Sequence, residues 1–221
     1  SEGMFDRARA LAWCPLPKGR RVAVITNAGG PGVTAADALE SLGLQLAELS
    51  DPTREALRSV LPPAASVNNP VDMLAAAGPE QFATCLRIVL DDPQVDSAMV
   101  IYPTPPMYTS GAVAKAVIPV VHNADKPVVV AVMGERLIQE AVEHLRAARI
   151  PEYRFPERAA AALSALVDRS ELLAFASASP VEIPDVQPRV VASLLDDLSS
   201  SGNGFLKPEA NQAILGAYGI P

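Results

Sequence analysis

The sequence predicts an α/β fold in which helices cover both faces of a doubly wound parallel sheet, giving three layers. Short apolar runs rich in β-branched residues, each bounded by Gly, Pro or Asn, occur at residues 21–26, 97–102 and 127–132. Such runs are typical of strands that are buried on both faces. Stretches of helical periodicity separate them, and strand and helix alternate about five times within residues 20–165. This alternation favours parallel strands joined by right-handed crossovers, as in a flavodoxin-like sheet.

The remaining elements follow from the same two periodicities. Weaker strands are expected at residues 44–48 and 152–155. One helix is expected directly after the first strand, and the others at residues 51–61, 78–90, 110–124, 134–148 and 156–173. Asp51 is the expected capping carboxylate of its helix, because Pro52 suits the first helical position.

The chain is expected to contain one domain with connections on both sides. Its 21 prolines separate the apolar runs of the domain and then gather in the segment that leaves it. Phe5 and Trp13 are expected to pin an N-terminal helix onto the domain. Four parts are expected, namely an N-terminal helix with its connection from a preceding domain (1–19), the α/β domain (20–175), a linker with one helix at 189–198 (176–207), and the start of a further domain (208–221).

Composition and charge exclude several classes of function. Lys and Arg number 18 against 25 Asp and Glu, which gives a net charge of −7, and no basic cluster offers a footprint for nucleic acid. Cys14 and Cys85 match no CxxC spacing, which disfavours a disulfide framework or a thiolate zinc site and suits the cytoplasm. No apolar run reaches the roughly 18–20 residues that span a bilayer. His122 and His144 have no carboxylate at ligand spacing, so neither a metal site nor a catalytic histidine is expected.

The strongest local motif is Thr-Asn-Ala-Gly-Gly-Pro-Gly-Val-Thr at residues 26–34, directly after the first strand. Its glycines let the backbone turn tightly and expose N–H groups, and Pro31 suits the first turn of a helix. The first N–H groups of a helix lack internal partners and carry the positive end of the helix dipole, so a phosphate is the expected ligand. The alternative is a tight turn with no ligand. The spacing matches neither a GxGxxG dinucleotide loop nor a P-loop.

A second candidate segment, residues 66–72, gathers polar side chains around a proline. Asn69, Pro70 and Asp72 could line the carboxyl end of a strand, where open α/β sheets bind ligands. The alternative, which the spacing alone favours, is a turn in which the amides bond their own backbone. Two loops after later strands, which contain Thr104 and Gly134, are expected on the same rim.

At these residues the chain resembles the NDP-forming acyl-CoA synthetases, which are ADP-forming acetate–CoA ligases related to succinyl-CoA synthetase. The segments that carry the resemblance lie in order along residues 1–170, at 15–33, 36–39, 61–66, 69–72, 133–134 and 153–159. Residues 213–221 resemble the first helix of the ATP-grasp domain that follows in fused members. Several segments in order are far more specific than one Gly-rich loop.

The resemblance implies a part in converting an acid, CoA and ATP to acyl-CoA, ADP and phosphate, through an acyl phosphate and a phosphohistidine. The chain would supply the second flavodoxin-like ligase domain, whose Gly-rich helix start faces the phosphorylated histidine. Asn69 and Asp72 carry over as loop residues near the phosphate. The residues that carry over by position as phosphate-binding are Asn27, Ala28, Gly29, Gly30, Gly32 and Val33.

The family's phosphohistidine lies in a segment similar to Ser-His-Thr-Gly-Ala, which has no match in this chain. The resemblance therefore implies that the chain holds no catalytic residue and is inert alone. ATP or ADP, Mg²⁺ and CoA would act in the full-length enzyme, with none bound tightly by this part. The implied partners are CoA-binding, phosphohistidine-bearing and ATP-grasp domains, within a cytoplasmic homo-oligomer.

Two alternatives stay open. In relatives that are fused to an acetyltransferase, the synthetase-like part would serve as a regulatory or ligand-sensing module without ligase activity. A flavodoxin-like FMN domain is the other alternative. Its phosphate loop would be rich in Ser and Thr, and the 5% aromatic content of this chain provides few rings to flank a flavin.

Overall fold

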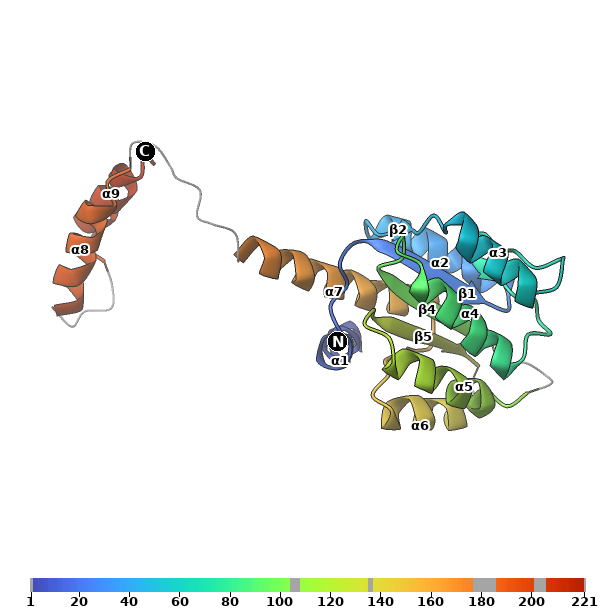
Figure 1. Ribbon diagram of the computed structural model, residues 1–221. Coiled ribbons are helices and arrows are strands. Elements are labelled where there is room, and N and C mark those ends of the chain that lie inside the picture. The colour runs from blue at the N-terminus through green and yellow to red at the C-terminus, as the bar shows by residue number, and fades with distance from the viewer. Residues whose placement is uncertain (1, 104–107, 135–136, 177–185, 201–205, 221) are drawn as a thin grey trace. The chain divides into compact units, whose positions relative to one another are not determined.

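The computed structural model describes residues 2–103, 108–134, 137–176, 186–200 and 206–220 (Figure 1). The chain divides into two compact units, Ser1–Ala176 and Ser177–Pro221. The elements of the first unit are α1 (Glu2–Trp13), β1 (Arg21–Thr26), α2 (Gly29–Ser41), β2 (Gln45–Leu46), α3 (Asp51–Val60), β3 (Val71–Asp72), α4 (Pro79–Asp91), β4 (Ser97–Pro103), α5 (Ser110–His122), β5 (Val128–Met133), α6 (Gln139–Ala147), β6 (Glu152–Tyr153) and α7 (Pro156–Ala176).

The described strands pair in parallel in the order β2-β1-β4-β5-β6. One edge of β1 pairs with β4 from Val22 to Thr26. The other edge is divided, because β2 pairs with the beginning of β1 and β3 pairs with its end. Leaving out β3, the order is the 2-1-3-4-5 order of flavodoxin-like sheets. The predicted doubly wound α/β fold is therefore confirmed.

Helices cover both faces of the sheet, which gives the three layers seen in Figure 1. On one face α1, α2 and α7 close a core cluster with residues such as Val24 and Ile101. On the other face α3, α4, α5 and α6 close a second cluster with Ile25 and Val100. Every residue of β4 except Pro103 is buried. Coverage on both faces explains why the central strands are apolar throughout instead of alternating.

A side chain fills the gap between the two short strands on the edge of β1. The Asn69 Oδ1 atom accepts a hydrogen bond of 2.8 Å from the Val24 amide. Its Nδ2 group donates to the carbonyl oxygens of Val22 at 2.7 Å and Ala47 at 3.0 Å. Asn69 thus makes the hydrogen bonds that a strand residue would make at this position, and it links β1 to the segment after β2.

Ion pairs, and not Phe5, hold α1 against α7. The side chain of Phe5 is 65% exposed, so the expectation that it pins the helix is wrong. The buried carboxylate of Asp6 accepts a hydrogen bond of 2.6 Å from Nε of Arg158 on α7. The Tyr153 hydroxyl donates to the Asp6 carbonyl at 3.1 Å. The energetic cost of burying these charged groups is offset because each one has a partner of opposite charge or a hydrogen bond.

Several element boundaries differ from the sequence-based expectation. Ser50, not Asp51, is the N-cap of α3, since the Thr53 amide donates to the Ser50 Oγ atom at 3.4 Å. The carboxylate of Asp51 instead accepts a hydrogen bond from Arg54 on the same helix. Helix α6 begins at Gln139, and α7 continues to Ala176. The strand β3 was not predicted at all.

The second unit is a pair of helices, α8 (Pro188–Ser200) and α9 (Pro208–Ala217), that pack against each other. The Gln187 amide donates to the Ala217 carbonyl at 2.9 Å. Among its described residues, Val191 and Ala217 are the buried apolar ones, whereas Leu195 and Ile220 are exposed. Within the described ranges of the whole chain, none of the helices combines the length and the apolar character needed to cross a membrane.

Candidate functional site

The start of α2 is tightly connected to the end of β1. Ala28 is the N-cap residue in an extended conformation, and its side chain offers no capping acceptor. The Thr26 hydroxyl accepts a hydrogen bond from the Ala28 amide and donates one to the Ala28 carbonyl, both at 3.0 Å. This local pairing fixes the turn, and it leaves the first amides of the helix without a capping side chain.

Two amides remain open at this helix start. The Gly32 amide donates to the Ala28 carbonyl at 3.3 Å, and Pro31 has no N–H group. Gly29 and Gly30 are exposed, and among the described residues no group accepts from their amides. These two N–H groups point out of the positive end of the helix dipole, which is the arrangement that binds anions.

Close packing explains two glycines of this segment. A Cβ atom on Gly32 would lie 3.2 Å from Cγ2 of Thr26 and 3.5 Å from Cβ of Pro70. A Cβ atom on Gly29 would lie 3.2 Å from the Oδ2 atom of Asp72. Because β3 pairs with the end of β1, Pro70 and Asp72 are brought against the helix start from a segment 40 residues further along the chain.

Hydrogen-bond acceptors accompany the two donors. The Oδ1 atom of Asp72 accepts from the Leu74 amide at 2.9 Å. No described group donates to its Oδ2 atom, the one that lies against Gly29. Asn27, directly before the N-cap residue, is only 4% exposed, and its Oδ1 atom has no hydrogen-bond partner among the described residues. A buried acceptor without a partner is uncommon and calls for a donor from elsewhere.

The structure brings together some of the residues predicted for the site and separates others. Asn27 to Val33, Pro70 and Asp72 lie around the start of α2, although the amides of Ala28 and Gly32 are already used. The amide group of Asn69 is engaged inside the sheet. Gly134 follows β5, two strands away from β1, with a φ of 144°. Thr104 lies outside the described residues.

The remaining reactive side chains are placed for packing. Burial raises the pKa of the Cys14 and Cys85 thiols to about 12, so both stay protonated and are poor nucleophiles. The His122 Nε2 atom lies 2.8 Å from the Ala148 carbonyl and links α5 to the end of α6. Among the described residues, no three His, Cys, Asp or Glu side chains come together as metal ligands.

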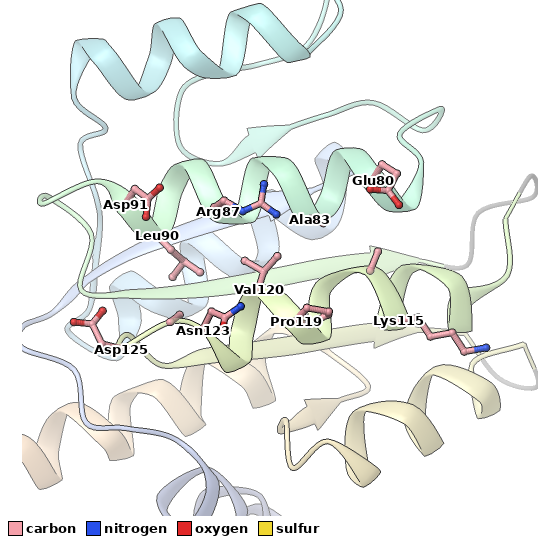
Figure 2. A pocket seen from close by; sticks show the side chains of 12 residues that line it. Glu80, Ala83, Arg87, Leu90, Asp91, Lys115, Pro119, Val120, Asn123 and Asp125 are labelled. Atoms are coloured by element: carbon pink, nitrogen blue, oxygen red, sulfur yellow. The ribbon is translucent and has the colours of Figure 1, made fainter.

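A groove of about 600 Å³ lies between α4 and α5 (Figure 2). Leu90 of α4 and Val120 of α5 face it from opposite sides, and Arg87 lies midway along α4. Its ends are charged, with Glu80 and Lys115 at one and Asp91 and Asp125 at the other. The lining residues include none from the start of α2. The groove therefore belongs to a different part of the surface from the start of α2.

Comparison with known proteins agrees with this architecture. The family model for the Ligase-CoA domain matches residues 22–171. The alpha subunit of acetate–CoA ligase [ADP-forming] II from Pyrococcus furiosus is 44% identical over 172 residues, which is 76% of this chain and 37% of that protein. The chain thus spans well under half of this relative's length.

Two solved structures are similar to most of this chain. A crystal structure of a protein from Pyrococcus horikoshii OT3 aligns with a TM-score of 0.74 and 42% identity, covering 77% of this chain and 40% of that one. The dinucleotide-forming acetyl-coenzyme A synthetase 1 of Ca. Korarchaeum cryptofilum, in complex with phosphate and ADP, aligns with a TM-score of 0.74 and 33% identity, covering 81% and 40%. With its parallel sheet, its Gly-rich helix start and a family match over residues 22–171, the chain belongs to the Ligase-CoA domain family and corresponds to part of the ADP-forming acetate–CoA ligases.

Proposed function

We propose that this chain is the phosphate-handling domain of an ADP-forming acyl-CoA synthetase. The observation that carries the proposal is the uncapped start of α2, where the amides of Gly29 and Gly30 are exposed and have no acceptor among the described residues. In this role the helix start binds the phosphoryl group of a phosphohistidine that a neighbouring domain supplies. The Korarchaeum relative, whose structure contains phosphate and ADP, supports a phosphate ligand within such enzymes.

The proposed contribution to the reaction is electrostatic. The two amides are fixed by the helix and by the Thr26–Ala28 hydrogen bonds, so they need no reorganisation when charge develops on the transferring phosphoryl group. We propose that the nucleophile and the other groups that carry out the chemical steps come from other domains, and we expect the chain alone to show no ligase turnover.

The other substrates and cofactors are assigned to the rest of the enzyme. This chain spans 37% of the length of the Pyrococcus furiosus relative, and we propose that the Mg²⁺ and ATP sites lie in the remaining part of the enzyme. The Pyrococcus furiosus relative is an alpha subunit, which supports the presence of protein partners. We propose that these partners are the CoA-binding, phosphohistidine-bearing and ATP-grasp domains.

The test is a Gly30→Asp substitution in the full-length enzyme. A Cβ atom at Gly30 meets nothing within 4 Å, and a carboxylate in the first turn suits the helix dipole, so the fold should survive. The new carboxylate occupies the place of the phosphoryl group and repels it. We expect discharge of the phosphoenzyme to fall by about 100-fold or more, the usual cost of losing oxyanion stabilisation.

Two matched variants serve as controls. Gly30→Ala keeps the amide and the charge, and it should keep nearly full turnover. Gly3→Asp places the same carboxylate in the first turn of α1, where a Cβ atom also meets nothing within 4 Å. Unchanged phosphoenzyme turnover in the Gly30→Asp enzyme would remove this domain from the chemistry.

A further inference from the structure

The helix start of α2 is not purely a donor site, although a site for a bare anion would need donors alone. The Asp72 carboxylate oxygen that lies against Gly29 stands beside the first of two amides, those of Gly29 and Gly30, that have no acceptor among the described residues. No described group donates to this carboxylate oxygen. Open donors and an unpartnered acceptor therefore meet at one helix start.

The carboxylate of Asp72 is held in place by its own segment. Its Oδ1 atom accepts from the Leu74 amide, and Leu74 adopts a φ of 68°, a conformation that non-glycine residues rarely adopt. The Asp72 carbonyl accepts from the Ser66 amide at 3.0 Å, and β3 pairs with β1 beside it. These contacts direct the second oxygen toward Gly29, where even a methyl side chain would come within 3.2 Å of it.

A fixed carboxylate beside an anion site discriminates between anions. It repels an oxyanion that carries no proton, and it accepts a charge-assisted hydrogen bond from one that carries an O–H group. The second pKa of a phosphorylated side chain is about 6, so a phosphate group carries a proton in part of the population at neutral pH. Sulfate has no proton to offer under these conditions.

We infer that the start of α2 selects a phosphoryl group that presents its own hydrogen-bond donor, and that Asp72 is the residue that determines this specificity. The amides of Gly29 and Gly30 bind the charged oxygens, and Oδ2 of Asp72 accepts the phosphoryl O–H. This inference rests on the proposed function, because it names the form of the ligand at the same site.

The experiment compares inorganic phosphate with sulfate. The 221-residue chain is titrated with each anion at matched ionic strength, and the amide resonances of Gly29 and Gly30 are followed by NMR. EDTA is present throughout, so no divalent cation can bridge the anion and Asp72. We expect phosphate to bind about tenfold more tightly than sulfate. Phosphate gains a charge-assisted hydrogen bond to Asp72, whereas sulfate is repelled by the same carboxylate.

Asp72→Asn is the diagnostic variant. Its Oδ1 atom can still accept from the Leu74 amide, and its uncharged Nδ2 group can donate to either anion, so the preference should shrink to about twofold or less. Asp37→Asn is the matched control, since Asp37 is an exposed residue further along α2 and the substitution removes the same charge. The control should keep the phosphate preference of the parent chain.

The outcomes separate this inference from the proposed function. Equal binding of phosphate and sulfate by the parent chain would overturn the inference while leaving the anion site standing. A preference that survives Asp72→Asn would overturn the assignment to Asp72. If neither anion moves the Gly29 and Gly30 resonances, both the inference and the anion site are wrong.

Discussion

Asn69 completes the edge of a sheet with a side chain where the backbone provides no strand. Its side-chain oxygen accepts a hydrogen bond from the N–H of Val24, and its side-chain N–H₂ group donates to the carbonyl oxygens of Val22 and Ala47. The Val22 carbonyl also accepts from the Ala47 amide at 2.9 Å, so it keeps one partner without Asn69. The Val24 amide and the Ala47 carbonyl belong to buried residues, so water cannot easily replace the partner that they would lose. The residue therefore affects the stability of β1, the strand that leads into the proposed anion site.

We predict that Asn69→Ala lowers the free energy of unfolding by about 2–4 kcal/mol, because buried backbone groups left unpaired cost roughly 1–3 kcal/mol each. Urea denaturation of the whole chain measures the change. Asn68→Ala is the matched control, since Asn68 is the exposed preceding residue, and it should change the stability by less than about 0.5 kcal/mol. Equal stability of the two variants would contradict the role given to Asn69.

The same residue shows what a sequence can predict at this scale. The Asn-Asn-Pro pattern indicates amides that bond backbone, and the local alternative was a turn that bonds its own backbone. The Asn69 amide does bond backbone, but at Val24, 45 residues away along the chain. The approach of Asp72 to Gly29 likewise depends on β3 pairing with β1. Such long-range pairings leave no signal in the local spacing of residues.

At the scale of elements, Asp96 ties the beginnings of β1 and β4 together. Its Oδ2 atom accepts from the backbone amide of Arg21 at 3.0 Å and from Nε at 2.9 Å, and its Oδ1 atom accepts from Nη2 at 2.8 Å. The hydrogen bond from the Arg21 side chain lowers the pKa of Asp96, although burial acts in the opposite direction. The contact is close enough that a Cβ atom on Gly19 would lie 2.5 Å from the carboxylate.

A carboxyl group whose pKa is lower in the folded state stabilises the fold only while it is ionised. Its contribution is present above the unfolded value of about 3.9 and is lost as the pH falls through the lower folded value. We predict that Asp96→Asn lowers the free energy of unfolding at pH 7 by about 1–2 kcal/mol, a figure reduced for the solvent exposure of Arg21. Between about pH 5 and 2, the variant should also lose less stability than the parent chain.

Urea denaturation at a series of pH values measures both effects. Asp91→Asn is the control, since Asp91 is an exposed carboxylate at the end of α4 with no ion pair among the described residues. It should keep the stability and the acid sensitivity of the parent chain. If Asp96→Asn showed the same loss of stability on acidification as the parent, the Asp96–Arg21 contact would not be the source of that sensitivity.

The sequence predicts long buried strands well, because their burial requires a long run of apolar residues. It predicts two-residue strands poorly, because two residues form no recognisable pattern. The runs that became β1, β4 and β5 are covered on both faces and therefore continuously apolar. The two-residue strand β3 exists because β2 leaves half of the β1 edge open, which no local pattern reports. At α3 the hydroxyl of Ser50 caps the helix, and Asp51 lies one position inside it. Capping positions shift by one residue because Ser and Asp are both good caps.

At the scale of the whole molecule, both core clusters lie within the first unit, between Ala10 and Val167. The second unit has few buried apolar residues of its own among those described, namely Val191 and Ala217. Several of its described large apolar side chains, including Val190, Leu195 and Leu215, are exposed. A pair of helices with so little buried apolar surface does not offset the conformational entropy lost on ordering.

We therefore predict that a chain ending at Ala176 folds alone. Its free energy of unfolding should lie within about 1 kcal/mol of the value for the whole chain, because the residues removed contribute nothing to either core cluster. The single tryptophan, Trp13, lies in α1, so its fluorescence in urea reports the same transition in both chains. Residues 177–221 alone should show little helix by circular dichroism. A truncated chain without a cooperative transition would mean that the first unit depends on the second, and the division of the chain into an independent α/β domain and a following segment would have to be abandoned.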